Sequence, residues 1–201
     1  MVFYGQALSI RDIDLKNKVV FIRVDFNVPL APGTLEITSD KRIKASLPTI
    51  KYALEQGAAL ILASHLGRPK GKRNPDMTLA PVAKRLAELL AGVKVTMAPD
   101  CIGADIPKPA PGEIVLLENL RFHAEEEKND PAFAQQLATG VEVYINDAFG
   151  TAHRAHASTV GMIQFCPVAG AGLLIDKELE HLGKATWNPA RPCNAILGGA
   201  K

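Results

Sequence analysis

The chain has 201 residues, of which 47% are apolar and 22% charged, and its formal net charge is +2. This length suits one globular domain, or one domain with part of a second, and so small a charge gives no argument for nucleic acid or a membrane surface as partner. No apolar run approaches the roughly 18 residues of a membrane span, the N-terminus lacks a signal-peptide pattern, and the three widely spaced cysteines suit reduced thiols, so a cytoplasmic location is expected.

The first third of the chain predicts a strand, a helix and a second strand. Branched and aromatic residues favour a strand over residues 19–24, and a short apolar run predicts another over residues 60–64. Between them, apolar residues recur three or four apart from Asp40, predicting a helix that Ser39 or Asp40 can cap and Gly57 ends. Pro48 lies inside this pattern and should kink or delay the helix.

The same alternation continues along the rest of the chain. Because strands alternate with helices, we expect an α/β fold, a three-layer Rossmann-like parallel sheet with helices on both faces. Residues 100–112 carry three prolines and predict a surface connection. The remaining predicted elements are helices over 78–92, 131–139 (capped by Asn129 or Asp130), 160–165 and about 172–184, and strands over 93–97, 114–117, 143–145 and 194–197.

Polar loops follow four of the predicted strands. The carboxyl ends of parallel strands meet at one edge of a sheet, where ligands bind in the crevice. Arginine provides a permanent charge and a planar fork of donors that fits phosphate and carboxylate. We therefore expect a site for a small, multiply charged anion, whose hydroxyl Asp25 and Asn27 can hydrogen-bond. The strand-end residues are Asp25, Asn27, His65, Arg68, Asn119, Arg121, His153, Arg154 and His156, with Arg42 opening the first long helix.

Simpler interpretations exist for each residue alone. A single arginine at a strand end is more often a surface or ion-pair residue, so the prediction depends on four of the nine arginines converging. His123 and His181 are likewise interpreted as surface or ion-pair residues without a functional role. Residues 125–127 are three glutamates, interpreted as a solvated helix face, because consecutive carboxylates on a helix do not converge.

His153 and His156 are three residues apart, a spacing that suits a metal site on a helix. No carboxylate or cysteine at matching spacing completes such a site, and Arg154 between the two histidines opposes a cation. We therefore predict no metal site here, and favour a role in holding the anion or in orienting Arg154. The turn at 198–201 lacks the full spacing of a Walker loop and is a weak phosphate signal alone.

Seven motifs stand in order along the chain: VDFNVP, RIKASLPTI, SHLGRPKG, LLENLRFH, EEEKND, INDAFGTAHRAHAST and ILGGAK. Together they closely resemble the phosphoglycerate kinase family from Val19 to Lys201. The resemblance implies two similar α/β domains, the first binding 3-phosphoglycerate and the second the magnesium nucleotide. It implies a glycerate-binding domain over residues 1–170, an interdomain helix and linker over 171–190, and the first strand and phosphate-contacting turn of a nucleotide domain over 191–201.

The resemblance also implies residue roles. Arg42 and Lys201 become candidates for neutralising charge on the transferring phosphoryl group, and Lys201 for contacting the nucleotide phosphates. No general base is needed, because the attacking carboxylate has a pKa near ~4. The residues expected around the substrate are Asp25, Phe26, Asn27, Arg42, His65, Leu66, Gly67, Arg68, Arg121 and Arg154.

The implied reaction interconverts 3-phosphoglycerate and ATP with 1,3-bisphosphoglycerate and ADP in glycolysis. Mg²⁺ would accompany ATP or ADP, with its ligands expected in the second domain. We expect a truncated, monomeric first lobe that binds glycerate but is inactive alone. The alternative is a non-catalytic anion-binding or regulatory module that keeps the basic crevice.

Overall fold

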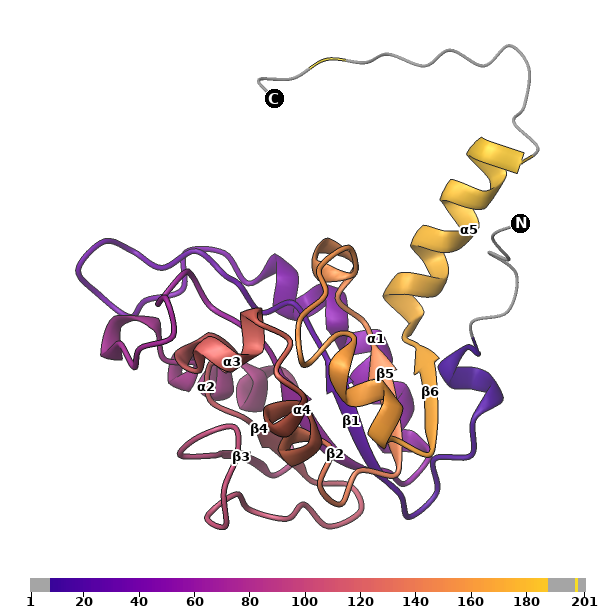
Figure 1. Ribbon diagram of the computed structural model, residues 1–201, viewed down its shortest axis with the longest axis horizontal. Coiled ribbons are helices and arrows are strands. Elements are labelled where there is room, and N and C mark those ends of the chain that lie inside the picture. Colours follow the sequence, from indigo (N-terminus) through magenta and orange to yellow (C-terminus); the bar gives the residue numbers. More distant parts are fainter. Residues whose placement is uncertain (1–7, 188–197, 199–201) are drawn as a thin grey trace.

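Six strands form one parallel sheet in the computed structural model, which describes residues 8–187 and 198 (Figure 1). Their spatial order is β3-β4-β2-β1-β5-β6, and every neighbouring pair runs parallel. This confirms the predicted parallel sheet, whose central strands are buried on both faces. The strands are β1 (Val19–Arg23), β2 (Ala59–Ala63), β3 (Val95–Met97), β4 (Ile114–Leu116), β5 (Val143–Asn146) and β6 (Val168–Ala171).

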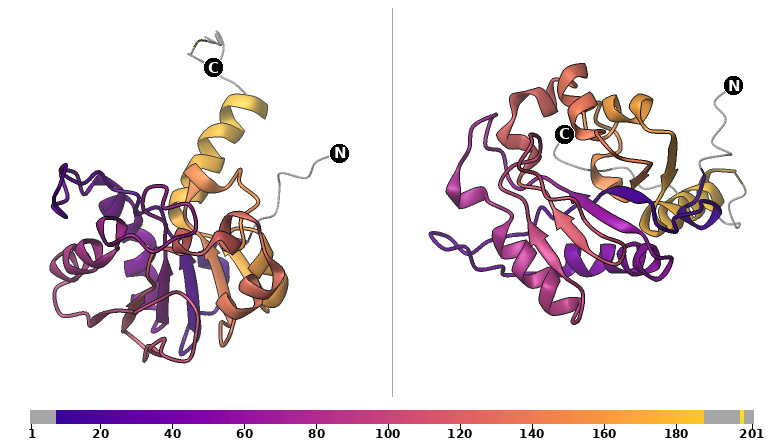
Figure 2. Two further views of the ribbon diagram at one scale, coloured as in Figure 1. Left: turned by 60° about the vertical axis from the view of Figure 1, so that its left-hand side comes forward. Right: turned by 90° about the horizontal axis from the view of Figure 1, so that it is seen from below.

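Helices cover both faces of the sheet, which gives the three predicted layers (Figure 2). On one face lie α1 (Lys41–Glu55) and α2 (Ala80–Leu89), and on the other α4 (Pro131–Leu137) and the 3-10 helix η5 (Gly161–Phe165). The other elements are α3 (Ala124–Glu127), α5 (Leu173–Trp187) and the 3-10 helices η1 (Ile10–Asp12), η2 (Pro75–Met77), η3 (Leu120–Phe122) and η4 (Phe149–Thr151).

Strand β1 divides its side chains between two cores, because successive strand residues point to opposite faces. Val20 and Ile22 pack into one core with Ile50 of α1. Phe21 packs into the other with Phe133 of α4. The strand is therefore held from both sides, and the loop that follows it starts from a fixed position.

Helix α1 begins at Lys41 and runs through Pro48 without interruption, so the expected delay of the helix is wrong. A proline removes only one backbone donor, and Ile43 and Ile50 are fully buried on either side of it. Asp40 stands at the N-cap but accepts no capping hydrogen bond, because its carboxylate is paired with Arg85 and Lys44 instead.

The structure corrects the sequence-based prediction at two other elements. Strand β6 was not predicted, since its sequence VAGA lacks the branched and aromatic residues that favour strands. The short helix predicted over 160–165 is present as a 3-10 helix over residues 161–165, so the correction there concerns only the type of helix. At α4 the prediction is confirmed, because Asp130 caps the helix by accepting a 2.9 Å hydrogen bond from the Phe133 N–H.

Helix α3 corrects the interpretation of residues 125–127 as a solvated face at Glu126, while Glu125 and Glu127 are exposed as expected. Glu126 is fully buried, whereas its neighbour Glu127 keeps 44% of its side chain exposed. The burial is possible because Ser158 donates two hydrogen bonds to the Glu126 carboxylate. A sequence of three identical residues gives no sign of which one has such a partner.

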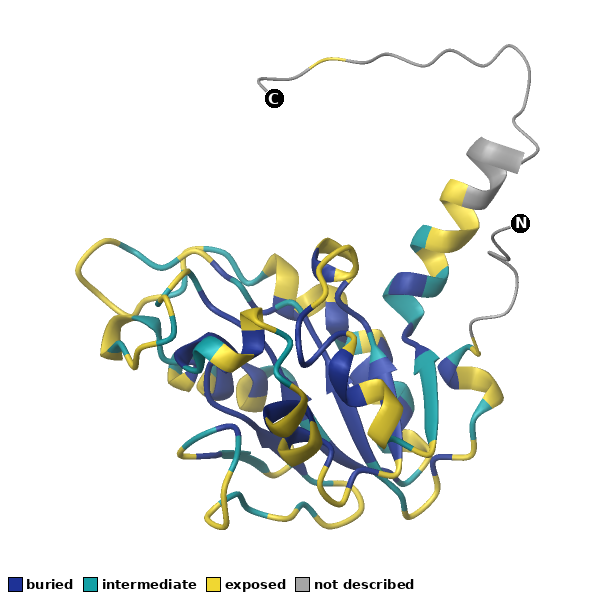
Figure 3. Cartoon of the chain, in the orientation of Figure 1, coloured by how far each residue is buried: buried dark blue, intermediate teal, exposed yellow. Residues whose placement is uncertain are grey.

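Helix α5 is attached to the body of the protein by its first turn and extends away from it (Figure 1). The Leu173 N–H donates to Thr49 of α1 at 3.0 Å, and the Leu174 N–H donates to Asp147 at 2.9 Å. From Lys177 to Leu182 most of its residues are exposed (Figure 3). None of the helices in the described part of the chain is long and apolar enough to cross a membrane.

The predicted strand over 194–197 and Lys201 lie outside the described residues.

Candidate functional site

A cavity of about 270 Å³ lies beyond the carboxyl ends of the central strands. At this position the chain changes direction across the sheet: it passes from β1 to β2 on one side, and later enters β5 on the other side of β1. Crevices at such a switch point are the usual ligand sites of open parallel sheets. The lining residues are Asp25, Asn27, Arg42, His65, Gly67, Arg68, Arg121, Gly150, Thr151 and Arg154.

Eight of the ten residues expected around the substrate line this cavity, including all four arginines. The other two, Phe26 and Leu66, belong to the apolar core, with 0% and 3% of their surface exposed. Each is part of a loop whose neighbours face the cavity, so it supports the loop from behind. His153 and His156 are not among the lining residues.

Sequence reasoning missed Gly150 and Thr151, which follow β5 in η4. A Cβ atom on Gly150 would lie 3.4 Å from the Asp25 carboxylate, so the loop after β5 lies beside the loop after β1. The motif INDAFGTAHRAHAST contains both residues, but only their position in space shows that they line a cavity.

The ten lining residues are here called the wall of the cavity. Two of them, Asp25 and Asn27, are already held in place by other residues of the protein. Arg42 Nη1 and Asp25 Oδ2 form an ion pair at 2.6 Å. The Gly67 N–H donates to Asn27 Oδ1 at 2.9 Å, which joins the loop after β1 to the loop after β2. Gly67 adopts a φ of +63°, a conformation that favours glycine, and Arg121 donates to its carbonyl at 3.0 Å.

Asn119 fastens the loop after β4 to the loop after β2. Its Oδ1 accepts from the N–H groups of Leu66 and Arg121 at 3.2 and 3.1 Å. Its Nδ2 donates to the carbonyls of Leu66 and Met77 at 2.7 and 2.9 Å. A fully buried amide with four hydrogen bonds fixes the backbone from which Arg121 extends.

Behind the wall lies a buried polar network, here called the arginine floor, formed by Arg23, Ser158 and Glu126. All three residues are 0% exposed. Arg23 Nε donates to Ser158 Oγ at 2.9 Å, and Ser158 donates to Glu126 through its N–H at 2.9 Å and its hydroxyl at 2.5 Å. Tyr144 donates from its hydroxyl to the Ser158 carbonyl at 2.9 Å. Arg23 and Ser158 could not be selected from local sequence patterns, because their partners are distant in the chain.

Electrostatics make the cavity suitable for an anion. Burial, together with the nearby charges of Arg23, Arg121 and Arg42, lowers the pKa of His65 to about 2. His65 is therefore neutral at physiological pH. Burial also lowers the pKa of Arg121, although arginine stays protonated in proteins. Four guanidinium groups thus face a cavity whose single carboxylate, Asp25, is already paired.

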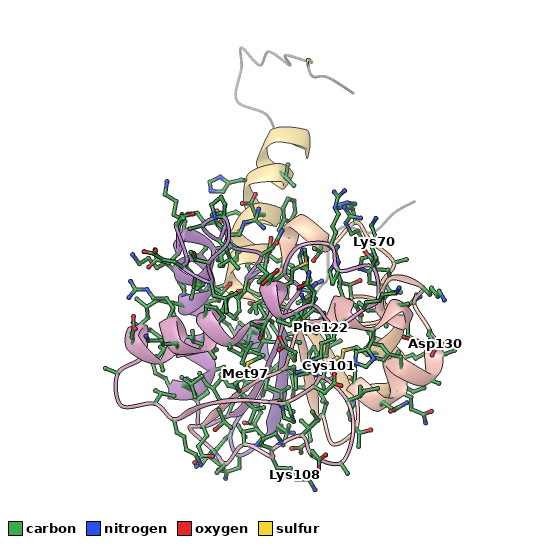
Figure 4. The ribbon with its side chains drawn as sticks, turned by 90° about the vertical axis from the view of Figure 1, so that its left-hand side faces the viewer. Lys70, Met97, Cys101, Lys108, Phe122 and Asp130 are labelled. Carbon is green, nitrogen blue, oxygen red and sulfur yellow. The ribbon has the colours of Figure 1, made fainter. Side chains whose placement is uncertain are left out.

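These lining residues do not fit Mg²⁺, which prefers several oxygen ligands, because Asp25 is the only carboxylate among them. Elsewhere, potential ligand atoms of Asp100, Cys101 and His123 lie within 4.8 Å of one another; Cys101 is labelled in Figure 4. Asp100 Oδ1 and His123 Nε2 already form a 2.7 Å hydrogen bond, and burial raises the pKa of the Cys101 thiol. A protonated thiol is a poor metal ligand, so these contacts are those of a closed polar cluster.

Comparison with known proteins gives consistent matches. A family model described as "Phosphoglycerate kinase" matches residues 10–201. A phosphoglycerate kinase of Solibacter usitatus is 70% identical over 199 residues, covering 96% of this chain and 51% of the relative. That of Koribacter versatilis is 59% identical, covering 96% of this chain and 50% of the relative.

Solved structures agree with these matches. The structure of phosphoglycerate kinase from Coxiella burnetii superposes with a TM-score of 0.83 at 41% identity, covering 93% of this chain and 47% of the other. The structure from Pyrococcus horikoshii gives a TM-score of 0.77 at 37% identity, covering 91% and 46% of the two chains. The chain spans about half the length of the curated relatives it matches.

Proposed function

The chain belongs to the phosphoglycerate kinase family, and from this premise we propose that its cavity binds 3-phosphoglycerate for phosphoryl transfer from ATP. The family resemblance expected from the seven motifs is confirmed by the match over residues 10–201. One observation carries the proposal: four arginines from four separate segments converge on a cavity whose only carboxylate is already paired.

The substrate's chemistry fits these groups. A phosphate and a carboxylate give 3-phosphoglycerate several negative charges, which guanidinium forks bind bidentately. Its hydroxyl group can donate to Asp25 and accept from Asn27. Asp25 and Asn27 are already hydrogen-bonded, so little ordering remains to be done on binding. We assign Arg68, Arg121 and Arg154 to the substrate's phosphate and carboxylate.

The proposed reaction needs positioning rather than a base. A substrate carboxylate oxygen forms a bond to the γ-phosphorus of ATP while the bond from that phosphorus to the bridging oxygen of ADP breaks, giving 1,3-bisphosphoglycerate. The carboxylate is ionised at neutral pH, so no proton must be removed. Catalysis then consists of alignment and neutralisation of charge on the transferring group.

We assign that neutralisation to Arg42 and Lys201. Arg42 keeps 50% of its side chain exposed, and its other guanidinium nitrogens are free to meet a second ligand. Lys201 lies outside the described residues and is proposed from the family motif to contact the nucleotide phosphates. We place Mg²⁺ and the nucleotide on the part of the relatives that this chain does not span, and expect the chain alone to bind glycerate without turnover.

Calorimetric titration of the chain with 3-phosphoglycerate, and separately with magnesium ATP, tests the proposal. We expect saturable glycerate binding that salt weakens, and no measurable binding of ATP. Arg68→Ala should weaken glycerate binding about tenfold to a hundredfold, the range for a charged hydrogen-bonding group. Arg85→Ala is the matched control, because Arg85 lies on α2, pairs with Asp40 and Glu88, and does not line the cavity.

Absence of glycerate binding, or binding that Arg68→Ala leaves unchanged, would contradict the assignment of the four arginines to one substrate site.

A further inference from the structure

Arg23 contacts a residue of the cavity wall, although it does not itself line the cavity. Its Nη2 lies 3.2 Å from Nδ1 of His65. Arg23 is the last residue of β1, and His65 follows β2, the strand that pairs with β1. Because both residues are set by adjacent strands, the contact is part of the sheet and does not depend on a mobile loop.

Hydrogen-bonding chemistry determines which group donates in this contact. A guanidinium carries five N–H donors, accepts nothing, and does not lose its proton in proteins. Since Arg23 can only donate, His65 Nδ1 must accept and therefore carries no hydrogen. A neutral imidazole carries a hydrogen on only one of its two ring nitrogens, which must then be Nε2.

The arginine floor prevents Arg23 from turning away. Its Nε donates to Ser158 Oγ at 2.9 Å, and its Nη1 donates to the Val24 carbonyl. A buried charge needs a counter-charge, which Glu126 supplies through Ser158. Each of the three guanidinium nitrogens thus has a partner, and Nη2 is the one directed at His65.

We propose that Arg23 is a positioning residue that fixes His65 as its neutral Nε2–H tautomer, so that the ring offers the bound anion a single N–H donor. His65 lines the cavity, and its Nδ1 edge faces Arg23, which leaves the Nε2 edge for the ligand. The identity of that anion rests on the function proposed above. The tautomer is a property of the protein without ligand and can be measured separately.

The groups around His65 keep it neutral. Arg23 of β1, Arg121 of η3, Arg42 of α1 and His156 after β5 all disfavour a positive charge on the ring, and burial acts in the same direction. The contribution of His65 to anion binding should therefore stay constant from about pH 5 to pH 8, where an unperturbed histidine would change its charge.

Two-bond ¹H–¹⁵N correlation spectra of the ¹⁵N-histidine-labelled chain without ligand test the tautomer. We expect the His65 signals to show a protonated Nε2 and a bare Nδ1 throughout that pH range, with no titration. His65→Gln, which removes these signals, identifies them among the five histidines. A hydrogen on Nδ1, or a titration midpoint above pH 5, would overturn the proposal.

Substitutions test whether Arg23 is the cause. Arg23→Met should give a mixture of tautomers and a higher titration midpoint, whereas Glu126→Gln, which leaves Arg23 in place, should retain the Nε2–H form. If Arg23→Met does not fold, the double variant with Glu126→Gln avoids the unpaired carboxylate, and the unsubstituted chain still decides the tautomer. A pure Nε2–H form in a folded Arg23→Met chain would show that Arg23 does not set it.

Titration with 3-phosphoglycerate connects the tautomer to binding. His65→Gln offers an amide N–H and should bind within about threefold of the original chain. His65→Leu offers no donor and should bind at least about tenfold more weakly. Equal losses in the two variants would contradict the donor role. If no form binds the glycerate while the spectra show the Nε2–H tautomer, the proposed function fails and the tautomer assignment stands.

Discussion

The arginine floor and the wall of the cavity use the same side chain in opposite ways. Arg23 in the floor is fully buried and engaged by Ser158, by the Val24 carbonyl and by His65. On the wall, no hydrogen bond or ion pair within the described residues holds the side chains of Arg68 and Arg154. Arg68 and Arg154 are therefore fully available to a ligand, whereas Arg42, paired with Asp25, and Arg121, paired with Glu127, are available only through their remaining donors.

The largest expected effect comes from removing the counter-charge of the floor. Glu126→Ala removes the buried carboxylate whose charge reaches Arg23 through Ser158, and removing one partner of buried opposite charges typically costs about 3–5 kcal/mol. Urea unfolding should show this loss in the free energy of unfolding. Glu125→Ala is the control: it changes an exposed carboxylate in the same helix and should cost less than about 1 kcal/mol. Equal costs for the two variants would mean that the floor and the surface do not differ.

Substitution of an arginine of the wall should lower catalytic activity and leave the free energy of unfolding almost unchanged. In a form of the protein as long as its relatives, Arg42→Ala should lower kcat about a hundredfold, the scale for one group that stabilises developing charge, with little change in KM. Steady-state kinetics with 3-phosphoglycerate measures both constants. A loss confined to KM would show that Arg42 only binds the substrate. Urea unfolding of the same variant should stay near the original value.

Among the described residues, Asp147 is a buried carboxyl group without a nearby positive charge, whereas the buried Arg23 of the floor has the negative charge of Glu126 close by. Burial raises the pKa of Asp147 to about 6. The folded protein therefore holds a proton that the unfolded chain releases between about pH 4 and pH 6, and this group's contribution makes the protein less stable as the pH rises through that window. Asp147→Asn should remove this decline and increase the free energy of unfolding at pH 7, by at most about 3 kcal/mol.

Urea unfolding of Asp147→Asn at pH 4.5 and pH 7, beside the original chain, measures this difference. Asp105→Asn, at an exposed position, controls for general effects of charge. If the free energies of unfolding of Asp147→Asn and the original chain differ by the same amount at pH 4.5 and at pH 7, Asp147 does not titrate as described.

The smallest effect is expected at the surface, where Arg85 pairs with Asp40 and Glu88 at 2.7 and 2.8 Å. Arg85→Ala should cost less than about 1 kcal/mol, because exposed ion pairs are screened by water and salt. The shift in the urea midpoint should shrink further as salt is added. A loss of stability as large as that of Glu126→Ala would show that burial does not make the contacts of Arg23 stronger than those of Arg85.

Local sequence signals were enough to predict most of the sheet and the wall. Apolar runs such as residues 60–64 identify strands buried on both faces, and the parallel arrangement then brings Arg68 and Arg121 to one edge. The floor was not predictable in the same way. Glu126 depends on Ser158, 32 residues later, and Arg23 depends on Ser158 and His65, so burial of these charges is decided by the tertiary fold.

The attachment of α5 has a mechanical consequence. The helix has 15 residues, hence a length of about 22 Å, and it is clamped at one end through Thr49 and Asp147. A rigid rod clamped at one end is a lever, so a tilt of about 5° at the clamp moves its far end by about 2 Å. Asp147 directly precedes the segment carrying Gly150 and Thr151. A displacement of the cavity lining that tilted this first turn would therefore be enlarged at the far end of α5.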